Sequence, residues 1–441
     1  MFQFESWRVS IKPKNILPQT DNCSYCLGTG LISSENFPEV NYEYPNVAII
    51  GWGIWWIALA VACLHRWIPY TLYERDESFN ARPQWYWLTL QQASKAIEWL
   101  GISKLEDWVT STKHVVHDST GKIIWEWWVR KFLDLESKNS TKRRNIHISR
   151  QWLRAELLNI LPKNEKVLWG KCLTHISLNS LWTNELEFSK SQERFTSQPD
   201  LIVWADGIRS RVRDYLIWEQ ESPLKYLGCI VILWICSLKS LREFQSDLLD
   251  SETVFQTVNG HERIYVMPFD SENIMWQLSF PIDERSAKNL SKKGADALKK
   301  EAIRRLWAWH SPIPELLNET SISLISWYPV YDREPLEPEE LETAWNITLL
   351  WDSMHPMSPF KGQWANQAIL DALDLARNIT SKCSSKSRWK EYWLRKILLA
   401  DYEKNIIKRS TKKVNDSAKA VKLLHSQAVM HDWEKPRWRG I

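Results

Sequence analysis

Glycine is the residue that this sequence lacks most. The chain has 13 glycines in 441 residues, whereas the usual share of roughly 7% predicts about 31. Tryptophan is in excess, with 29 copies. A folded chain needs glycine wherever the backbone turns through positive φ or approaches another backbone closely. We therefore infer that many of the tryptophans occupy positions that call for glycine.

Three explanations of this exchange stay open. Our hypothesis is that UGA codons read as glycine in the source organism were rendered as tryptophan, and the rivals are deliberate substitution and a genuinely tryptophan-rich protein. A bulky side chain that replaces glycine at positive φ adds roughly 1 to 2 kcal/mol of strain. We therefore expect the chain as written to fold poorly or to bind a cofactor weakly. The motif or turn positions concerned are Trp52, Trp55, Trp56, Trp85, Trp87, Trp204, Trp351 and Trp364, and Trp67 is a further candidate.

Cysteine is sparse and scattered, with seven copies. Five lie in apolar surroundings that are typical of reduced, buried thiols, which favours an intracellular, cytoplasmic protein. Cys23 and Cys26 form a single Cys-x-x-Cys with no second ligand pair at usable spacing. The sequence therefore predicts a turn there, and no metal site.

Charge and hydropathy exclude two further classes. The net charge is only +4, but residues 380–441 carry 16 Lys and Arg against 6 Asp and Glu, which makes this tail basic. A solvated amphipathic helix is favoured there over nucleic-acid binding, and weak peripheral membrane contact stays open. The 18 apolar or glycine residues 47–64 are just long enough to span a bilayer. Because they divide into strand, turn and helix, we predict no transmembrane segment, and the N-terminus lacks a secretory signal.

The hydrophobic pattern predicts an α/β chain with an inserted sheet. After a polar extension at 1–44, residues 47–74 indicate a strand–helix–strand unit and hence a parallel sheet. We predict that 45–220 and 340–380 form this first domain and that 221–339 form an inserted antiparallel sheet, with a basic helical tail at 381–441. The remaining expected elements are helices at 88–100, 149–161, 292–309 and 365–379 and strands at 123–132, 226–235, 254–257, 263–268, 275–281 and 347–350.

The first turn has most of a dinucleotide-binding fingerprint. In G-x-G-x-x-G the first glycine makes the turn, the second admits a pyrophosphate, and the third lets helix and strand pack closely. Gly51 and Gly53 fill the first two positions, and Trp56 stands at the third. Glu74 follows the next strand, where a carboxylate accepts hydrogen bonds from ribose hydroxyls.

Two later motifs also follow predicted strands. Asp206 and Gly207 come after the strand that contains Trp204, and Asp352 comes after the strand at 347–350. The loop that begins at His355 leads into the N-terminus of a helix, where free amides stabilise negative charge. A turn carboxylate remains the alternative for Asp352, and a packed imidazole for His355.

The three ordered motifs resemble those of the class A FAD-dependent monooxygenases, and the likeness runs from about residue 46 to 379. The resemblance implies a Rossmann-like FAD-binding domain of the GR2 type, with an antiparallel-sheet substrate domain inserted into it. It implies that NAD(P)H reduces FAD, that O2 gives a flavin C4a-hydroperoxide, and that a small organic substrate, with an aromatic one favoured, is oxygenated. The expected cofactor-binding residues are Gly51, Gly53, Trp56, Glu74, Arg75, Arg150, Asp206, Gly207, Asp352, Pro359, Gly362, Gln363 and Asn366.

The flavin would carry the chemistry, so no side chain is assigned as catalytic beyond the loop residues His355 and Pro359. The expected substrate pocket consists of Tyr265, Met267, Trp276 and Phe280, with plain core packing as the alternative. A flavin oxidase, dehydrogenase or halogenase on the same fold is a second interpretation. A non-catalytic binding protein without flavin is a third, because tryptophan stands at the glycine positions.

Overall fold

The computed structural model describes most of the chain beyond the N-terminal extension. The described residues are 31, 39–51, 53–81, 87–91, 93–102, 109–128, 146–162, 166–178, 183–190, 193–217, 222–241, 244, 246–270, 272–384, 387–391 and 393–431. Cys23 and Cys26, with the turn expected there, and Trp52 and Trp85 lie outside them.

A five-stranded parallel sheet forms the first layer, in the order β18-β12-β1-β2-β8. Its central strand is almost wholly apolar, as expected for a strand buried on both faces. The strands are β1 (Val47–Gly51), β2 (Tyr70–Glu74), β8 (Val167–Trp169), β12 (Leu201–Ala205) and β18 (Ile347–Leu349). Their parallel pairing confirms the predicted Rossmann-like sheet.

A seven-stranded sheet forms the second unit, in the order β17-β13-β16-β15-β14-β5-β6. Its strands are β5 (Lys113–Asp118), β6 (Ile123–Trp128), β13 (Lys225–Ser237), β14 (Thr253–Val258), β15 (Arg263–Pro268), β16 (Asn273–Pro281) and β17 (Ser326–Asp332). The predicted inserted sheet is therefore present. It also includes residues 113–128, which the predicted boundary at 220 assigned to the first domain, and β5 pairs with β14 in parallel.

Two smaller sheets complete the strand inventory of the described residues. One has the order β3-β7-β4, from β3 (Trp87–Leu90), β7 (Ile146–Ser149) and β4 (Val109–Thr110). The other has the order β11-β10-β9, from β9 (Cys172–Leu178), β10 (Asn184–Lys190) and β11 (Glu193–Ser197). The helix expected over 88–100 was wrong in its first part, because β3 pairs there with β7 and only the short α2 (Ser94–Glu98) follows.

Helices cover these sheets. The remaining helices are α1 (Ile54–Leu64), α3 (Arg150–Ile160), α4 (Arg211–Leu216), α5 (Glu284–Lys292), α6 (Gly294–Leu306), α7 (Ile313–Glu319), α8 (Trp364–Lys382) and α9 (Ala400–Leu424). The helix expected over 292–309 is confirmed as α6, which runs from Gly294 to Leu306. It is separate from α5, which ends at Lys292, and Gly294 has a left-handed φ of 81° at the break. Among the described residues, no helix is both long and apolar enough to cross a membrane.

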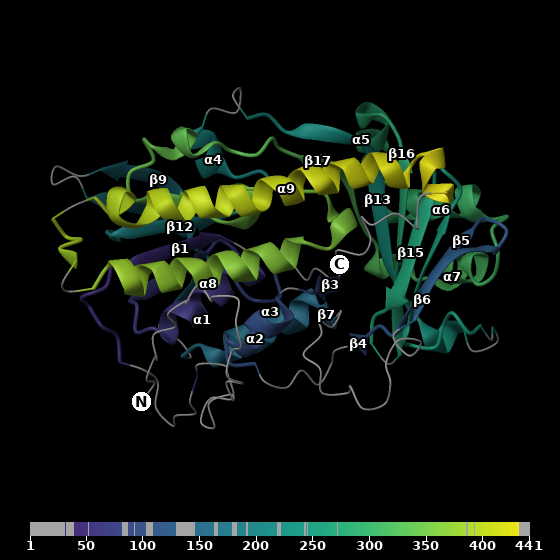
Figure 1. The fold of residues 1–441 in the computed structure, drawn as a ribbon, viewed down its shortest axis with the longest axis horizontal. Helices are drawn as coiled ribbons and strands as arrows, with labels where there is room; N and C mark the ends of the chain where they lie inside the picture. The colour runs from purple at the N-terminus through teal and green to yellow at the C-terminus, as the bar shows by residue number, and fades with distance from the viewer. Residues whose placement is uncertain are drawn as a thin grey trace, which may run out of the picture.

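The basic tail is more deeply integrated than a solvated helix. Figure 1 shows α9 (yellow) beside α8 and extending to the seven-stranded sheet. Ahead of α9, Arg395 forms a buried ion pair with Glu403 at 2.6 Å. Arg395 also donates to the carbonyl oxygens of Trp345 and Ile347, each at 2.8 Å. The tail thus packs onto the edge of the parallel sheet and joins the two units.

Candidate functional site

The first turn lies at the carboxyl end of β1. Gly51 has φ of 138°, and a Cβ built on it would lie 2.5 Å from the carbonyl oxygen of Ala205 on the neighbouring strand. Only glycine fits both the conformation and the space. Gly53 precedes α1 with an extended φ of 165°, which any residue adopts, and a Cβ built there would lie 3.3 Å from Trp55 Cδ1.

The predicted arginine comes to this turn. Arg150 is the first residue of α3, and the Ser149 hydroxyl caps that helix by accepting from the amide of Trp152 at 3.4 Å. Arg150 is buried, and its Nη2 lies 3.8 Å from a Cβ built on Gly53. A cation therefore stands beside the N-terminus of α1, where both favour an anion.

The acidic residue after β2 is in place as well. Glu74 ends β2, the strand next to β1, and is buried. Its Oε1 accepts from the amide of Asp76 at 2.9 Å. Arg75, expected beside it in the cofactor set, is exposed to solvent. Its role stays a prediction.

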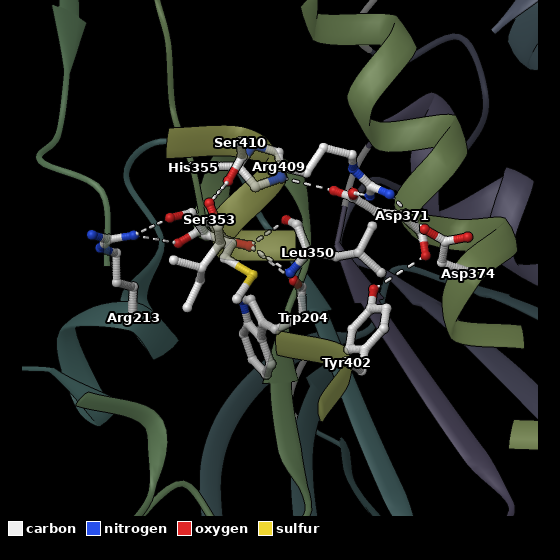
Figure 2. A network of polar contacts seen from close by, with 12 residues as sticks. Trp204, Arg213, Leu350, Ser353, His355, Asp371, Asp374, Tyr402, Arg409 and Ser410 are labelled. Atoms are coloured by element: carbon white, nitrogen blue, oxygen red, sulfur yellow. Dashed lines mark hydrogen bonds and ion pairs between the residues drawn. The ribbon is translucent and has the colours of Figure 1, made fainter. Parts of the chain in front are cut away.

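Arg213 joins the middle motif to the late loop, which is the segment from Trp351 to His355, as Figure 2 shows. Ser210 caps α4 by accepting from the amide of Arg213 at 3.0 Å. The Nη1 of Arg213 donates to the carbonyl oxygens of Ser353 at 3.0 Å and Met354 at 2.7 Å. Asp206 and Gly207 thus precede a helix whose arginine holds the late loop. Arg213 lies seven residues after Asp206 in the sequence, and no local pattern indicated its contact with the late loop.

Asp352 lies in this late loop as a buried carboxyl. Burial raises its pKa well above the usual value, and its Oδ1 has no hydrogen-bond partner among the described residues. The neighbouring Ser353 Oγ lies 2.9 Å from the carbonyl oxygen of Trp204, at the end of β12. A buried carboxyl with an unmatched oxygen is costly, so Asp352 fits a site that receives a hydrogen-bond donor.

His355 points to α8. Its Nε2 lies 2.7 Å from Oδ2 of Asp371. The other carboxylate oxygen of Asp371 is paired with Arg409 of α9, and Arg409 also bonds Asp374 at 2.5 Å. Figure 2 shows this chain running from the late loop to the tail helix. These contacts hold the buried imidazole in place, which favours the alternative of a packed imidazole for His355. No local sequence pattern indicated Asp371 or Arg409.

The loop before α8 is fastened to β3. It includes Pro359, and Gly362 adopts a left-handed φ of 58°. Asn366 accepts from the amides of Gln91 at 2.8 Å and Ala93 at 3.0 Å, and donates to the carbonyl oxygens of Thr89 and Gly362, each at 2.9 Å.

Asn366 is therefore fully engaged in holding the loop, whereas it was expected to bind cofactor. Gln363 donates to Gln91 Oε1 at 2.7 Å, and its own Oε1 has no hydrogen-bond partner among the described residues. Gln91 was missed because a helix was expected over that segment.

The four expected pocket residues divide between the two faces of the seven-stranded sheet. Tyr265 and Met267 pack toward the parallel-sheet unit. Trp276 and Phe280 point the other way, into the core under α5, α6 and α7, so their pocket assignment was wrong. The indole of Trp276 donates to the Thr320 hydroxyl at 3.0 Å in that core. Strand alternation explains the division, since adjacent strands place Val266 opposite Trp276.

A buried arginine on the inner face was not expected from the sequence. Arg263 donates from Nε to Gln256 at 2.7 Å and lies over the rings of Tyr265 and Phe360. Desolvation by burial lowers its pKa to about 10. Because Phe360 belongs to the loop before α8, this contact brings the inner face of the sheet next to that loop.

Tryptophan side chains pack between the first turn and the late loop. The ring of Trp55 lies 4.8 Å from that of Trp351, and Trp351 lies 6.1 Å from Trp364. Trp56, at the third glycine position, is fully buried beside Trp169 at 6.4 Å. Buried indole nitrogens without a hydrogen-bond partner among the described residues include those of Trp55, Trp56, Trp204 and Trp351.

The backbone independently indicates glycine. Trp67, Trp345 and Trp351 have φ of 60°, 51° and 58°, in the left-handed region that disfavours bulky residues. Buried Arg150 and the N-terminus of α1 fit an anionic group at the first turn, and the carboxyls of Glu74 and Asp352 fit hydroxyl donors. The indoles of Trp55, Trp351 and Trp364 do not fit such a ligand, because they fill the space between the first turn and the late loop.

Comparisons with known proteins agree with the fold. No protein-family model matches the chain. It is 31% identical over 180 residues to aurachin C monooxygenase/isomerase of Stigmatella aurantiaca, covering 41% of this chain and 42% of that protein. It is 24% identical over 360 residues to chloroplastic zeaxanthin epoxidase of Solanum lycopersicum, covering 78% of this chain and 49% of that protein. The chain thus spans about half the length of these curated relatives.

Among solved structures, HpxO of Klebsiella pneumoniae complexed with FAD and uric acid superposes with a TM-score of 0.70 at 19% identity. The match covers 88% of this chain and 90% of that chain. The chain is therefore related to the class A FAD-dependent monooxygenases and shares their fold.

Proposed function

We propose that this protein is a flavin-dependent monooxygenase that uses FAD, NAD(P)H and O2 to oxygenate a small organic, preferably aromatic, substrate. One observation carries the proposal: the three motifs meet at the carboxyl ends of adjacent parallel strands, in the order β18, β12, β1, β2. In open α/β sheets this edge is where ligands bind. The relatives are named as monooxygenases or epoxidases.

The residues have distinct proposed roles toward FAD. Gly51 and Gly53 open the turn, Arg150 and the amides of α1 hold the diphosphate, and Glu74 accepts from the ribose. Asp352 accepts from the ribitol chain. The amides at the start of α8 would stabilise negative charge on bound FAD, which would supply the oxygen-transfer chemistry.

The remaining cofactor assignments also stay proposals. Arg75, Asp206, Gly207, Pro359, Gly362 and Gln363 complete the proposed FAD-contact set. Of the expected pocket, Tyr265 and Met267 are retained as substrate-facing residues, because they lie on the inner face of the seven-stranded sheet.

We propose a cytoplasmic protein. Among the described cysteines, Cys63, Cys229, Cys236 and Cys383 are buried free thiols, whereas Cys172 is exposed, which corrects the expectation that all five are buried. Weak contact with an anionic membrane stays part of the proposal, through the exposed lysines of α9.

The test compares two versions of the full chain. One is the chain as written, and the other has glycine at 52, 55, 56, 85, 87, 204, 351 and 364. We expect flavin absorbance to co-purify with the glycine version and substrate-stimulated NAD(P)H oxidation to accompany it. A Trp276→Gly variant of the chain as written is the control and should gain no flavin. Reading the codons behind these tryptophans tests the genetic-code hypothesis directly.

Two other functions remain outcomes of this test. If flavin binds and the product is desaturated or halogenated, the protein is another flavin oxidoreductase. If neither version retains flavin, the proposal fails. A cofactor-less binding protein is then favoured, in line with the buried indoles between Trp55 and Trp364.

A further inference from the structure

A continuous chain of four polar side chains crosses the junction between the two units. His114 Nε2 lies 2.9 Å from Ser111 Oγ. Ser111 Oγ also lies 2.9 Å from His147 Nε2. His147 Nδ1 lies 3.1 Å from Thr89 Oγ1. Every member of the chain can both donate and accept a proton.

The burial of the chain is uneven. Ser111 and His147 in the middle are 3% and 0% exposed, whereas His114 and Thr89 at the two ends are partly exposed. A network that only satisfied buried polar groups would need no accessible end at each side. The middle is sealed, so a proton that crosses it must pass through these side chains.

The two ends lie in different units. His114 is on β5 of the seven-stranded sheet, and Thr89 is on β3, directly opposite His147 of β7. A Cβ built on Gly362 would lie 3.8 Å from Thr89 Cβ, and the Thr89 carbonyl accepts from Asn366. The Thr89 end therefore adjoins the loop before α8, beside the proposed flavin site.

We propose that His114, Ser111, His147 and Thr89 form a proton relay that joins the site beside Gly362 to the far side of the β4–β5 connection. The inference rests on the proposed function only for what stands at the Thr89 end. A group in the site gives its proton to Thr89 Oγ1 as the Thr89 hydroxyl proton moves to His147 Nδ1. His147 then passes its Nε2 proton to Ser111, Ser111 passes its proton to His114 Nε2, and His114 releases its Nδ1 proton to water.

The geometry allows two hydrogen-bond directions. Ser111 has one hydroxyl proton, so when it donates to one histidine it accepts from the other. If Ser111 donates to His114, then His114 carries its proton on Nδ1 and His147 on Nε2. If Ser111 donates to His147, both positions reverse. As long as Ser111 donates to one of them, as the relay requires, the two neutral histidines therefore carry opposite tautomers. Burial lowers the pKa of His147 to about 3 and that of His114 to about 4, which keeps both rings neutral near pH 7.

The first experiment needs no flavin. Nitrogen-15 NMR of histidine-labelled full chain reads the tautomer of each ring, and opposite tautomers for His114 and His147 are expected. In Ser111→Ala the two tautomers should become independent. Thr112→Val is the matched control, because its hydroxyl bonds Glu252 outside the relay. Identical tautomers, or a doubly protonated ring at pH 7, would overturn the relay.

The second experiment uses the flavin-loaded glycine version. Thr89→Val keeps the shape and removes the hydroxyl, so oxygenation should slow by roughly 10²-fold, the lower end of what positioned proton transfer contributes. The solvent deuterium isotope effect should change with it, and Thr89→Ser should restore both. An unchanged rate and isotope effect in Thr89→Val overturn the proposal. If no version binds flavin, the proposed function fails, and the tautomer measurement alone decides the relay.

Discussion

The indole of Trp55 packs against the indole of Trp351, with ring centroids 4.8 Å apart and planes inclined by 53°. The first residue belongs to the glycine turn and the second to the late motif, so the contact lies between the segments that would enclose a cofactor. Trp351 also has a left-handed φ of 58°. Position and conformation thus both indicate that glycine belongs at residue 351.

The left-handed tryptophans make a stability prediction. Trp67 has φ of 60° and is only partly buried, so Trp67→Gly removes roughly 1 to 2 kcal/mol of backbone strain and loses little packing. We expect the free energy of unfolding in urea to rise by about 1 kcal/mol. Trp276→Gly, in a fully buried β-strand position, should lower it by roughly 3 to 5 kcal/mol. Equal losses in both variants would contradict the idea that Trp67 replaces a glycine.

A glycine that is present should be irreplaceable. In Gly51→Ala the new methyl group would meet the Ala205 carbonyl oxygen at 2.5 Å, which forces β1 and β12 apart. Gly228 also has positive φ, at 80°, but has no atom within 4 Å of a built Cβ. We expect Gly228→Ala to cost about 1 kcal/mol and Gly51→Ala to cost at least twice that in thermal unfolding. Similar melting temperatures for the two variants would argue against the close approach.

The tail should matter through Arg409. This residue pairs with the fully buried Asp371, which in turn lies 2.7 Å from His355. Arg409→Met leaves a buried carboxylate without its cation, which typically costs roughly 3 to 5 kcal/mol. Arg377→Met is the matched control, because Arg377 is half exposed and lies 3.9 Å from Asp374, a type of pair worth at most about 1 kcal/mol. Urea unfolding of both variants measures the difference, and equal effects would show that the Arg409 pair contributes no more than a surface contact.

Asp332 should give the protein a pH-dependent stability. Burial raises its pKa from 3.8 to about 6, because a buried carboxylate is poorly solvated. The raised pKa of Asp332 therefore adds to the free energy of unfolding below about pH 4, relative to neutral pH. This contribution is lost as pH rises through about 6. Asp332→Asn should flatten the fall in urea stability between pH 4 and 6.

A control carboxylate has the opposite sign. The Asp283 carboxylate caps α5, and its hydrogen bonds to Ser286 lower its pKa. Its contribution is lost as pH falls. Asp283→Asn should therefore leave the loss of stability between pH 4 and 6 in place. A flattened profile in Asp283→Asn would show that Asp332 is not the cause of that loss.

The order of the motifs, and their position at the ends of strands, could be predicted from the sequence alone. Gly51, Asp206 and Asp352 were predicted to follow apolar strands; Gly51 is the last residue of β1, and Asp206 and Asp352 follow β12 and β18. This works because buried parallel strands read as short apolar runs, and the polar residue that ends each run lies at the same edge of the sheet. The inserted sheet was predictable for a similar reason, since its strands alternate.

What the sequence could not decide was set by contacts between distant segments. The segment at 88–100 was misjudged because β3 exists only by pairing with β7. The facing of Tyr265 and Trp276 depended on the register of β15 against β16. The sequence by itself thus determined the fold class and the motif positions, because these follow from local patterns. Only the tertiary structure decided that Arg409 reaches Asp371 and that His147 meets Ser111, because such contacts depend on packing that no local pattern encodes.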